Sequence, residues 1–108
     1  MPSEFAERVY AALRQVPRGR VTSYLALAKA VSCGSAQAIG QVLRRNPYAP
    51  EVPCHRVVDS QGNLHGFRGE KTGAAMDEKA ALLEKEGVLI QAGKVKAFAK
   101  IFWAELQK

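Results

Sequence analysis

The chain has 108 residues, 47% of them hydrophobic and 24% charged, which predicts one packed domain over residues 1–108 and excludes two domains of ordinary size. Its two cysteines could pair in principle, but they fit free thiols in a reducing compartment better than a disulfide framework. No apolar run approaches the roughly 18 residues of a membrane span, and the opening PSEF lacks a signal-peptide pattern.

The formal net charge of +6 is unevenly placed along the chain. Residues 1–56 carry eight Lys or Arg against three Asp or Glu, or +5, whereas residues 57–108 carry eight against seven, or +1. A basic first half is typical of proteins that bind an anionic partner such as nucleic acid, although a solvated basic face has the same composition.

Two helices are predicted first along the chain. The first follows a Ser3 cap and ends before Pro17-Arg18-Gly19, and its apolar stripe comprises Phe5, Val9, Leu13 and Val16. Thr22 or Ser23 caps the second helix, which ends at Ser32-Cys33-Gly34. Its apolar stripe comprises Tyr24, Leu27, Ala28 and Val31.

A third helix completes a helix-turn-helix pattern with the second. Ser35 caps it, Asn46-Pro47 ends it, and its apolar face comprises Ala36, Ile39, Gly40 and Leu43. The opposite face carries amides and guanidiniums, the groups that hold phosphates and contact base edges: Gln37, Gln41, Arg44 and Arg45. We expect this face to contact DNA, with an ordinary solvated surface as the alternative.

Short strands and one longer helix are predicted in the second half. Residues 56–58 and 64–67 have strand composition around the turn 59–62, a hairpin that fits the wing of a winged helix. A helix that begins at Thr72 ends at Gly87 in the C′ position, with Lys85 in its last turn. Residues 88–90 and 95–98 form a second hairpin across Ala92-Gly93, and the tail IFWAEL folds back on the core. The expected fold class is α+β, mainly helical: a winged helix-turn-helix domain with a small β-hairpin wing.

The stretch VPCHRVV places Cys54 beside His55. Successive residues of a flat strand point to opposite faces, so these two side chains can cooperate only if residues 53–56 form a turn or a single helical loop. His55 could then polarise the thiol directly or through one water, with a carboxylate orienting the ring. Ordinary core sequence is the alternative. A metal site is not expected, because Cys33, Cys54, His55 and His65 lack zinc-motif spacing.

NPYAPEVPCHRVV, with Asn46 eight residues before Cys54, resembles the active-site signature of the O6-alkylguanine-DNA alkyltransferases. GRVTSYLALAKAV resembles the segment that leads into their helix-turn-helix. GFRG and KAALLEKEG resemble their active-site loop and the helix after it. The matches follow the family's order over roughly residues 5 to 90. The resemblance implies direct DNA repair, in which the protein flips an O6-alkylated guanine from the duplex and moves the alkyl group irreversibly to its own cysteine.

The resemblance also implies roles for particular residues. Cys54 is the alkyl acceptor, and His55 with Glu86 forms a hydrogen-bonded relay that deprotonates it through water. Asn46 braces the active-site turn. Tyr24 matches the family tyrosine that rotates the phosphate and donates a proton towards the base.

Further residues are implied in binding DNA and the damaged base. The Val57 carbonyl faces the guanine amino group, the Arg68 backbone N–H faces O6, and Phe67 lies over the pocket where the family commonly has tyrosine. Arg56 and the polar face of the third helix complete the DNA-binding set. Gln37 stands where family members usually have an arginine that fills the space of the flipped base, so base flipping is less well supported.

The short form is shared with alkyltransferase-like proteins, which resemble this chain in length and in a tryptophan-containing tail. They generally have tryptophan in place of Cys54, bind alkylated DNA without repairing it, and mark it for nucleotide excision repair. A non-catalytic sensor that recruits nucleotide excision repair proteins is therefore the alternative. A winged-helix transcription factor leaves Asn46, Cys54, His55 and Glu86 unexplained, and a cysteine hydrolase leaves the helix-turn-helix unexplained.

These inferences define the expected partners and location. The partner is double-stranded DNA that contains O6-alkylguanine, and neither a cofactor nor a metal nor a membrane is implied. We expect a monomer in the cytoplasm, associated with the nucleoid, or in the nucleus.

Overall fold

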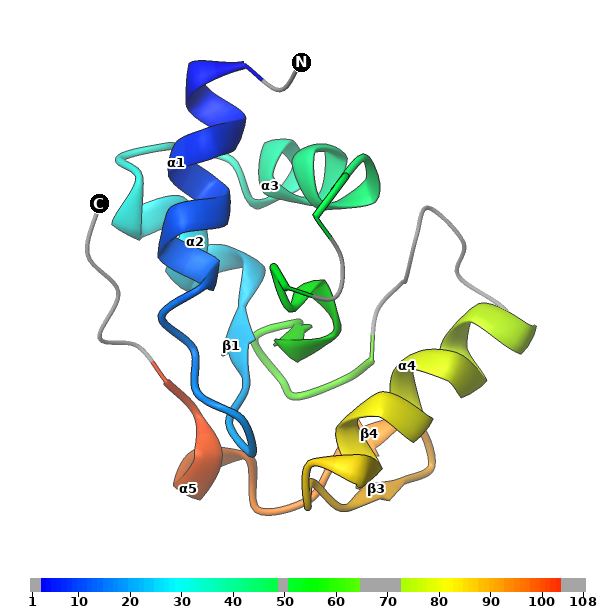
Figure 1. Cartoon of the computed structure of the whole chain (residues 1–108). Helices are drawn as coiled ribbons and strands as arrows, with labels where there is room; N and C mark the ends of the chain where they lie inside the picture. The colour runs from blue at the N-terminus through cyan, green and yellow to red at the C-terminus, as the bar shows by residue number, and fades with distance from the viewer. Residues whose placement is uncertain (1–2, 49–50, 65–72, 104–108) are drawn as a thin grey trace.

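The computed structural model describes residues 3–48, 51–64 and 73–103, and these form a mainly helical α+β domain with two small sheets (Figure 1). The expected fold class is thus confirmed. Within the described residues, no helix combines the length and apolar character needed to cross a bilayer. The elements, in chain order, are α1 (Glu4–Leu13), β1 (Thr22–Ser23), α2 (Tyr24–Ala30), α3 (Ala36–Arg44), the 3-10 turn η1 (Cys54–Arg56), β2 (Val57–Val58), α4 (Gly73–Lys85), β3 (Ile90–Gln91), β4 (Lys94–Val95) and α5 (Phe98–Ile101).

Serine caps begin the three N-terminal helices, as the sequence predicts. The hydroxyls of Ser3, Ser23 and Ser35 each accept a hydrogen bond from the backbone N–H three residues ahead, at 3.0, 3.0 and 3.1 Å, and so satisfy an N–H that has no partner within the helix. The first helix ends at Leu13, earlier than its apolar stripe suggests, and Val16 is buried in the turn that follows. Helices α1, α2 and α3 pack on one another around a shared apolar core.

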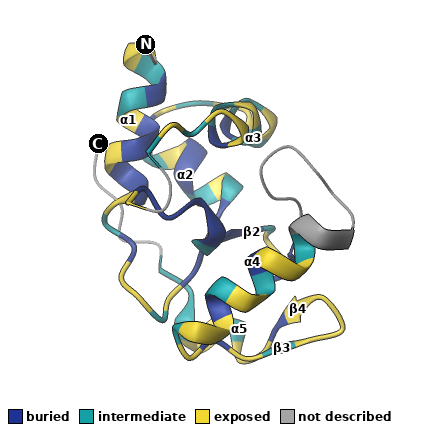
Figure 2. Cartoon of the chain, turned by 45° about the vertical axis from the view of Figure 1, so that its right-hand side comes forward, coloured by how far each residue is buried: buried dark blue, intermediate teal, exposed yellow. Residues whose placement is uncertain are grey.

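The parallel pair β1–β2 lies between two apolar clusters. Thr22 pairs with Val57 and Ser23 with Val58. Because neighbouring strand residues point to opposite faces, Val57 joins the cluster under the N-terminal helices and Val58 joins the cluster under α4 and the C-terminal hairpin. Figure 2 shows this pair as the buried centre of the domain.

The first strand of the predicted wing hairpin has a partner that the sequence did not indicate. Residues 57–58 pair with β1, a partner that the hairpin prediction did not include, and Arg56 belongs to the η1 turn. The turn itself is present, because the Asp59 carboxylate accepts from the backbone of Gln61 and Asn63 at 2.8 and 2.9 Å. After it the chain turns towards β4: Asn63 bridges Lys94. Residues 65–67 lie outside the described residues.

The end of α4 follows the predicted glycine stop. Gly87 has φ +91°, and the backbone N–H groups of Gly87 and Val88 donate to the carbonyls of Glu84 and Leu83, both at 3.0 Å. This is a Schellman motif, and the apolar contact that accompanies it is made by Leu83 and Val88, both buried in one cluster. The motif places Glu86 at the helix end, directed towards η1.

The C-terminal hairpin and tail also form largely as predicted. β3 and β4 pair antiparallel across Ala92-Gly93, which both have positive φ as a tight hairpin turn requires. The hairpin is shorter than predicted, since Phe98 belongs to α5. The tail returns to the core as expected: the Trp103 backbone N–H donates to the Val21 carbonyl at 2.7 Å. Tail residues beyond 103 lie outside the described residues.

Candidate functional site

Cys54 opens a single helical turn, the geometry that cooperation with His55 requires. The Arg56 N–H donates to the Pro53 carbonyl at 2.9 Å, and the Val57 N–H donates to the Cys54 carbonyl. The turn therefore replaces the strand geometry that would separate the two side chains. Cys54 and Cys33 are both free thiols, and Cys54 is 8% exposed. Cys54 belongs to the apolar cluster under the N-terminal helices.

Asn46 braces the chain that leads into this turn. Its side-chain amide donates to the Val52 carbonyl at 2.9 Å, and its amide oxygen accepts from the Tyr48 N–H at 2.9 Å. The same Val52 carbonyl accepts from the Cys54 N–H at 2.9 Å. One side chain thus ties both ends of the loop before the cysteine, an arrangement consistent with the bracing predicted for Asn46.

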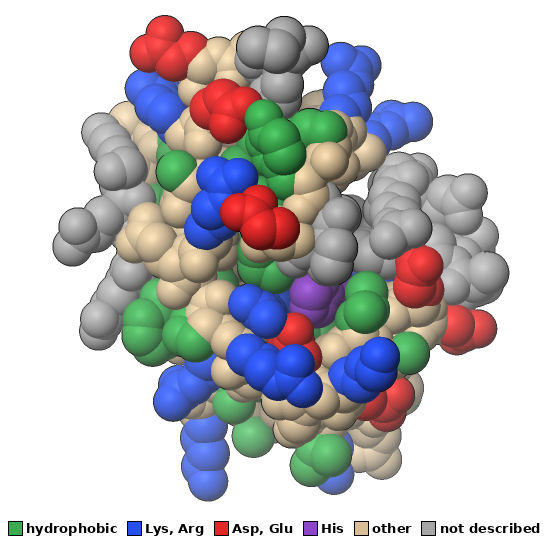
Figure 3. Space-filling view, viewed as in Figure 1, with side chains coloured by type: hydrophobic (Ala, Val, Ile, Leu, Met, Phe, Trp, Pro, Cys, Tyr) green, Lys and Arg blue, Asp and Glu red, His purple; other side chains and the backbone are tan. Residues whose placement is uncertain are grey.

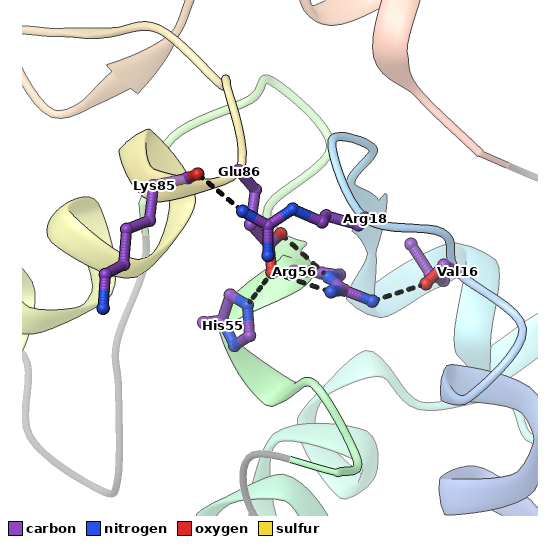
Figure 4. A network of polar contacts seen from close by, with 6 residues as sticks. All are labelled: Val16, Arg18, His55, Arg56, Lys85 and Glu86. Carbon is purple, nitrogen blue, oxygen red and sulfur yellow. Dashed lines mark hydrogen bonds and ion pairs between the residues drawn. The ribbon is translucent and has the colours of Figure 1, made fainter.

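A buried polar network joins η1 to the end of α4 (Figure 4). His55 Nε2 lies 3.0 Å from Glu86 Oε2, and the side chains are 5% and 7% exposed. Arg56 grips the same carboxylate with two nitrogens, Nε at 2.9 Å and Nη2 at 2.7 Å, and its Nη1 donates to the Val16 carbonyl at 2.8 Å. The sequence predicted the His55–Glu86 contact but missed the part played by Arg56.

The charges in this network determine which nitrogen of His55 carries a proton. Burial pushes the pKa of Glu86 upward, but hydrogen bonds from Arg56 and His55 more than offset burial and lower it to about 2. Burial lowers the pKa of His55, against the opposing influence of Glu86. An ionised carboxylate only accepts hydrogen bonds, so Nε2 of the neutral ring must be the donor. The remaining nitrogen, Nδ1, is then free to accept a proton.

Lys79 is a site residue that sequence reasoning missed. Its side chain is completely buried, and Nζ donates to the Val57 carbonyl at 2.6 Å. Burial lowers its pKa to about 8, although the charges of Cys54 and Asp59 act in the other direction. Nζ also lies 5.9 Å from the centre of the Tyr24 ring. The available signal for a buried lysine was its position among apolar residues of the predicted helix, but many exposed lysines have the same surroundings in sequence.

Tyr24 lies at the start of α2, next to this lysine. Burial raises the pKa of Tyr24 to about 12, helped by the charges of Cys54 and Asp59. The phenol therefore keeps its proton throughout the neutral range. Lys79 and Tyr24 form a group of proton donors on the side of β2 that carries the Val57 carbonyl.

The predicted DNA-binding face of α3 is exposed. Gln37, Gln41, Arg44 and Arg45 are all exposed, while Ile39 and Leu43 of the same helix are buried. Figure 3 shows basic side chains beside α3 at the upper right of this view, and a second group around the loop after α1 and the end of α4.

The other predicted binding residues are Arg56, Phe67 and Arg68. The guanidinium of Arg56 contacts the Glu86 carboxylate and the Val16 carbonyl, and its DNA contact stays a prediction. Phe67 and Arg68 lie outside the described residues, as does His65. Among the residues that can be described, no three His, Cys, Asp or Glu side chains come together as metal ligands.

Comparison with known proteins identifies the family. Residues 4–88 match the model of the 6-O-methylguanine DNA methyltransferase, DNA binding domain. The chain belongs to this family. Among relatives, the methylated-DNA–protein-cysteine methyltransferase of Mycobacterium leprae is 41% identical over 85 residues, which cover 78% of this chain and 48% of the relative. This member of the methyltransferase domain family therefore spans about half the length of the curated relatives it matches.

Two solved structures resemble this member of the family closely. S. pombe Atl1, crystallised with damaged DNA containing O6-carboxymethylguanine, has a TM-score of 0.79 and 29% identity, with 95% of this chain and 98% of Atl1 covered. Mycobacterium tuberculosis OGT, crystallised with DNA, has a TM-score of 0.71 and 38% identity, with 80% and 51% covered. Atl1 matches this chain over nearly its whole length, whereas OGT matches over about half of its length.

Proposed function

We propose that this chain binds duplex DNA at an O6-alkylated guanine and accepts the alkyl group on Cys54, once per chain. The observation that carries the proposal is the turn that holds Cys54 directly before His55, with Nε2 of His55 3.0 Å from the buried Glu86 carboxylate. A thiol needs a neighbouring base with an oriented ring to become a nucleophile. Here Cys54 supplies the thiol, His55 the base and Glu86 the group that orients the ring.

Alkyl transfer on this proposal begins with the thiol proton. Nδ1 of His55 accepts it, directly or through one water, while Glu86 stabilises the imidazolium through Nε2. Sulfur then attacks the alkyl carbon as the carbon–O6 bond breaks, so a carbon–sulfur bond replaces a carbon–oxygen bond. The thioether has no easy reverse reaction, so no chain turns over. Placement of sulfur, carbon and O6 in line supplies most of the acceleration.

The guanine that leaves must receive a proton. Tyr24, which keeps its phenolic proton, donates it on this proposal, and the adjacent Lys79 can restore it. The Val57 carbonyl already accepts from Lys79, but a carbonyl has two lone pairs, so it can also accept from the guanine amino group. These residues would hold the base and stabilise the charge that develops on it.

The exposed face of α3 would bind the duplex. Arg44 and Arg45 hold phosphates, and Gln37 and Gln41 contact base edges or backbone. The Atl1 and OGT structures support this, because both proteins share the fold and were crystallised with DNA. Gln37 offers an amide to the orphaned base but no charge, so the flipped state is stabilised less than an arginine would stabilise it.

A second candidate function is lesion binding without transfer. The match to S. pombe Atl1, which covers 95% of this chain and 98% of Atl1, favours it. In this case the bound lesion would mark the DNA for nucleotide excision repair proteins. Cys54 on the same turn as His55, and the contact of His55 with the buried Glu86 carboxylate, favour transfer over this candidate.

Mass spectrometry distinguishes the two candidates. The chain is incubated with duplex DNA containing O6-methylguanine, and intact and peptide masses are measured together with binding. Transfer predicts one methyl group on Cys54, in proportion to protein and without turnover, and none on Cys33. Cys54→Ala should bind the lesion and gain no mass, whereas Cys33→Ser should gain the methyl group normally. Lesion-selective binding without a mass gain selects the second candidate, and no preference for the lesion rejects both.

A further inference from the structure

Arg56 connects three segments that are far apart in the sequence. Its two contacts with the Glu86 carboxylate reach the end of α4, its Nη1 contact with the Val16 carbonyl reaches the turn after α1, and its backbone belongs to η1. Figure 4 shows the guanidinium lying between the Glu86 carboxylate and the Val16 carbonyl. All three side-chain nitrogens therefore have a partner within the protein.

The carboxylate receives hydrogen bonds from two directions. His55 Nε2 and Arg56 Nη2 both contact Oε2, at 3.0 and 2.7 Å, and Arg56 Nε contacts Oε1 at 2.9 Å. A planar guanidinium that binds both oxygens fixes the plane of the carboxylate, which an ammonium group on a flexible stem does not do. The orientation of Glu86, and through it the ring of His55, therefore depends on Arg56.

Stability alone is a weak reason for such an arrangement. A buried ion pair often adds nothing to stability compared with apolar residues of the same size, because both charges lose their hydration. By contrast, a base that must accept a proton at one defined nitrogen needs a fixed tautomer and a fixed ring plane. The geometry matches the second requirement.

We propose that Arg56 is a positioning residue of the relay, which holds Glu86 ionised and in one plane so that His55 keeps its proton on Nε2 and presents Nδ1 as the acceptor. The catalytic use of this role rests on the proposed alkyl transfer, whereas the effect of Arg56 on Glu86 and His55 does not. The proposal assigns to Arg56 an internal role beside the DNA contact expected from the sequence.

The effect of removing the guanidinium has a definite sign. The charged groups that act on His55 are Glu86, Arg56 and Lys79, and those that act on Glu86 are Arg56 and His55. Without Arg56 the pKa of Glu86 rises, and the pKa of His55 rises because a neighbouring positive charge is gone. Both groups then take up protons at a higher pH. Reaction of the thiol should therefore be lost at a higher pH on the acid side of its pH profile.

The test compares Arg56→Met, Arg56→Lys and a matched control, Arg18→Met. Arg18 also contacts the end of α4, donating to the Lys85 carbonyl at 2.8 Å, whereas Arg56 binds the Glu86 carboxylate itself. For each protein, the rate of methyl transfer from O6-methylguanine DNA and the rate of Cys54 alkylation by iodoacetamide are measured against pH, with Cys54 followed by peptide mass. NMR of labelled histidine reports whether the proton is on Nε2.

We expect the acid limb of both profiles to move up by about one pH unit or more in Arg56→Met, with lesion binding changed much less than the transfer rate. Arg56→Lys keeps the positive charge but cannot bind both oxygens of Glu86 in one plane. In this variant His55 should therefore show a mixture of tautomers. Arg18→Met should match the wild-type chain. If Arg56→Met does not fold, Arg56→Lys carries the test.

Two outcomes are decisive in different ways. If the folded Arg56 variants keep the wild-type profiles and the wild-type Nε2 proton, Arg56 does not position the relay. If the wild-type chain never accepts a methyl group, yet iodoacetamide profiles and NMR change as expected, the positioning role stands and the proposed alkyl transfer fails.

Discussion

Replacing Glu86 by Gln should destabilise the domain far more than the same change at Glu51. The chain provides a matched pair, because each glutamate binds an arginine through two nitrogens. Glu86 is held by Arg56 at 2.7 and 2.9 Å, and Glu51 by Arg14 at 2.8 and 3.1 Å. The Glu86 side chain is 7% exposed and the Glu51 side chain 65%. The pairs differ in burial and in the additional contact of Glu86 with His55.

The expected magnitude follows from two independent estimates. Removing one partner of a buried pair costs about 3–5 kcal/mol, because the other charge is left without compensation. The pKa of Glu86 is lowered from 4.5 to about 2, and at about 1.4 kcal/mol per pKa unit this corresponds to roughly 3 kcal/mol. For a domain of this size, a loss of about 3 kcal/mol lowers Tm by at least about 12 °C. The exposed pair should contribute little.

The free energy of unfolding should also depend on pH differently in the two variants. Because the folded pKa of Glu86 lies below its unfolded value, its contribution is complete above about pH 4.5 and is lost as the pH falls towards 2. Glu86→Gln removes that loss. The buried, neutral His55 also destabilises the fold in acid, below its unfolded pKa of about 6.5, and that loss should remain in the variant.

Urea denaturation followed by circular dichroism, at several pH values between 3 and 7, measures both effects. The reasoning is refuted if Glu86→Gln costs no more than Glu51→Gln at pH 7. It is also refuted if the two variants lose the same stability between pH 4.5 and 3, since only one of them keeps the buried carboxylate.

Three other changes test the loop, the buried lysine and α3. Asn46→Ala removes the hydrogen bonds to Val52 and Tyr48 and should cost about 1–2 kcal/mol in urea denaturation while speeding labelling of the thiol; unchanged labelling would contradict the bracing role. In the wild-type chain, stability should rise between pH 8 and 10, because the unfolded chain holds the Lys79 proton more strongly than the folded chain. Lys79→Met should abolish that rise, and equal slopes in the two proteins would exclude the buried ammonium as its source. Gln37→Arg should strengthen binding to lesion-containing duplex at fixed salt, and an unchanged or weaker affinity counts against our account of the α3 face.

The features predicted correctly from the sequence depend on neighbouring residues. A serine hydroxyl caps an N–H three residues away, and glycine adopts a positive φ wherever a helix stop requires it. The serine caps, the stop at Gly87, the turn at Ala92-Gly93 and the exposed face of α3 all have this local origin. The motif around Cys54 likewise indicated the family. Pro53 indicated a turn at the cysteine, and Cys54 opens the η1 turn.

The features that the sequence did not indicate are contacts between segments that are distant in the sequence. Val57 and Val58 have strand composition, but composition does not say whether their partner is the following segment or Thr22 and Ser23, which come more than thirty residues earlier. The sequence placed Arg56 in the DNA-binding set and did not indicate its partners within the protein. Whether it turns inward depends on where Glu86 lies, and that depends on how α4 packs.

Sequence alone therefore determined the helices, their caps, the polar face of α3 and the motif that carries Cys54 and His55. Tertiary structure decided which strand lies beside β2, which carbonyl receives the Lys79 ammonium, and that one guanidinium holds the carboxylate behind His55. The physical reason is range. Backbone propensity and capping act over three or four residues, whereas the burial of a charge becomes tolerable only when folding brings a partner from 20 or 30 residues away.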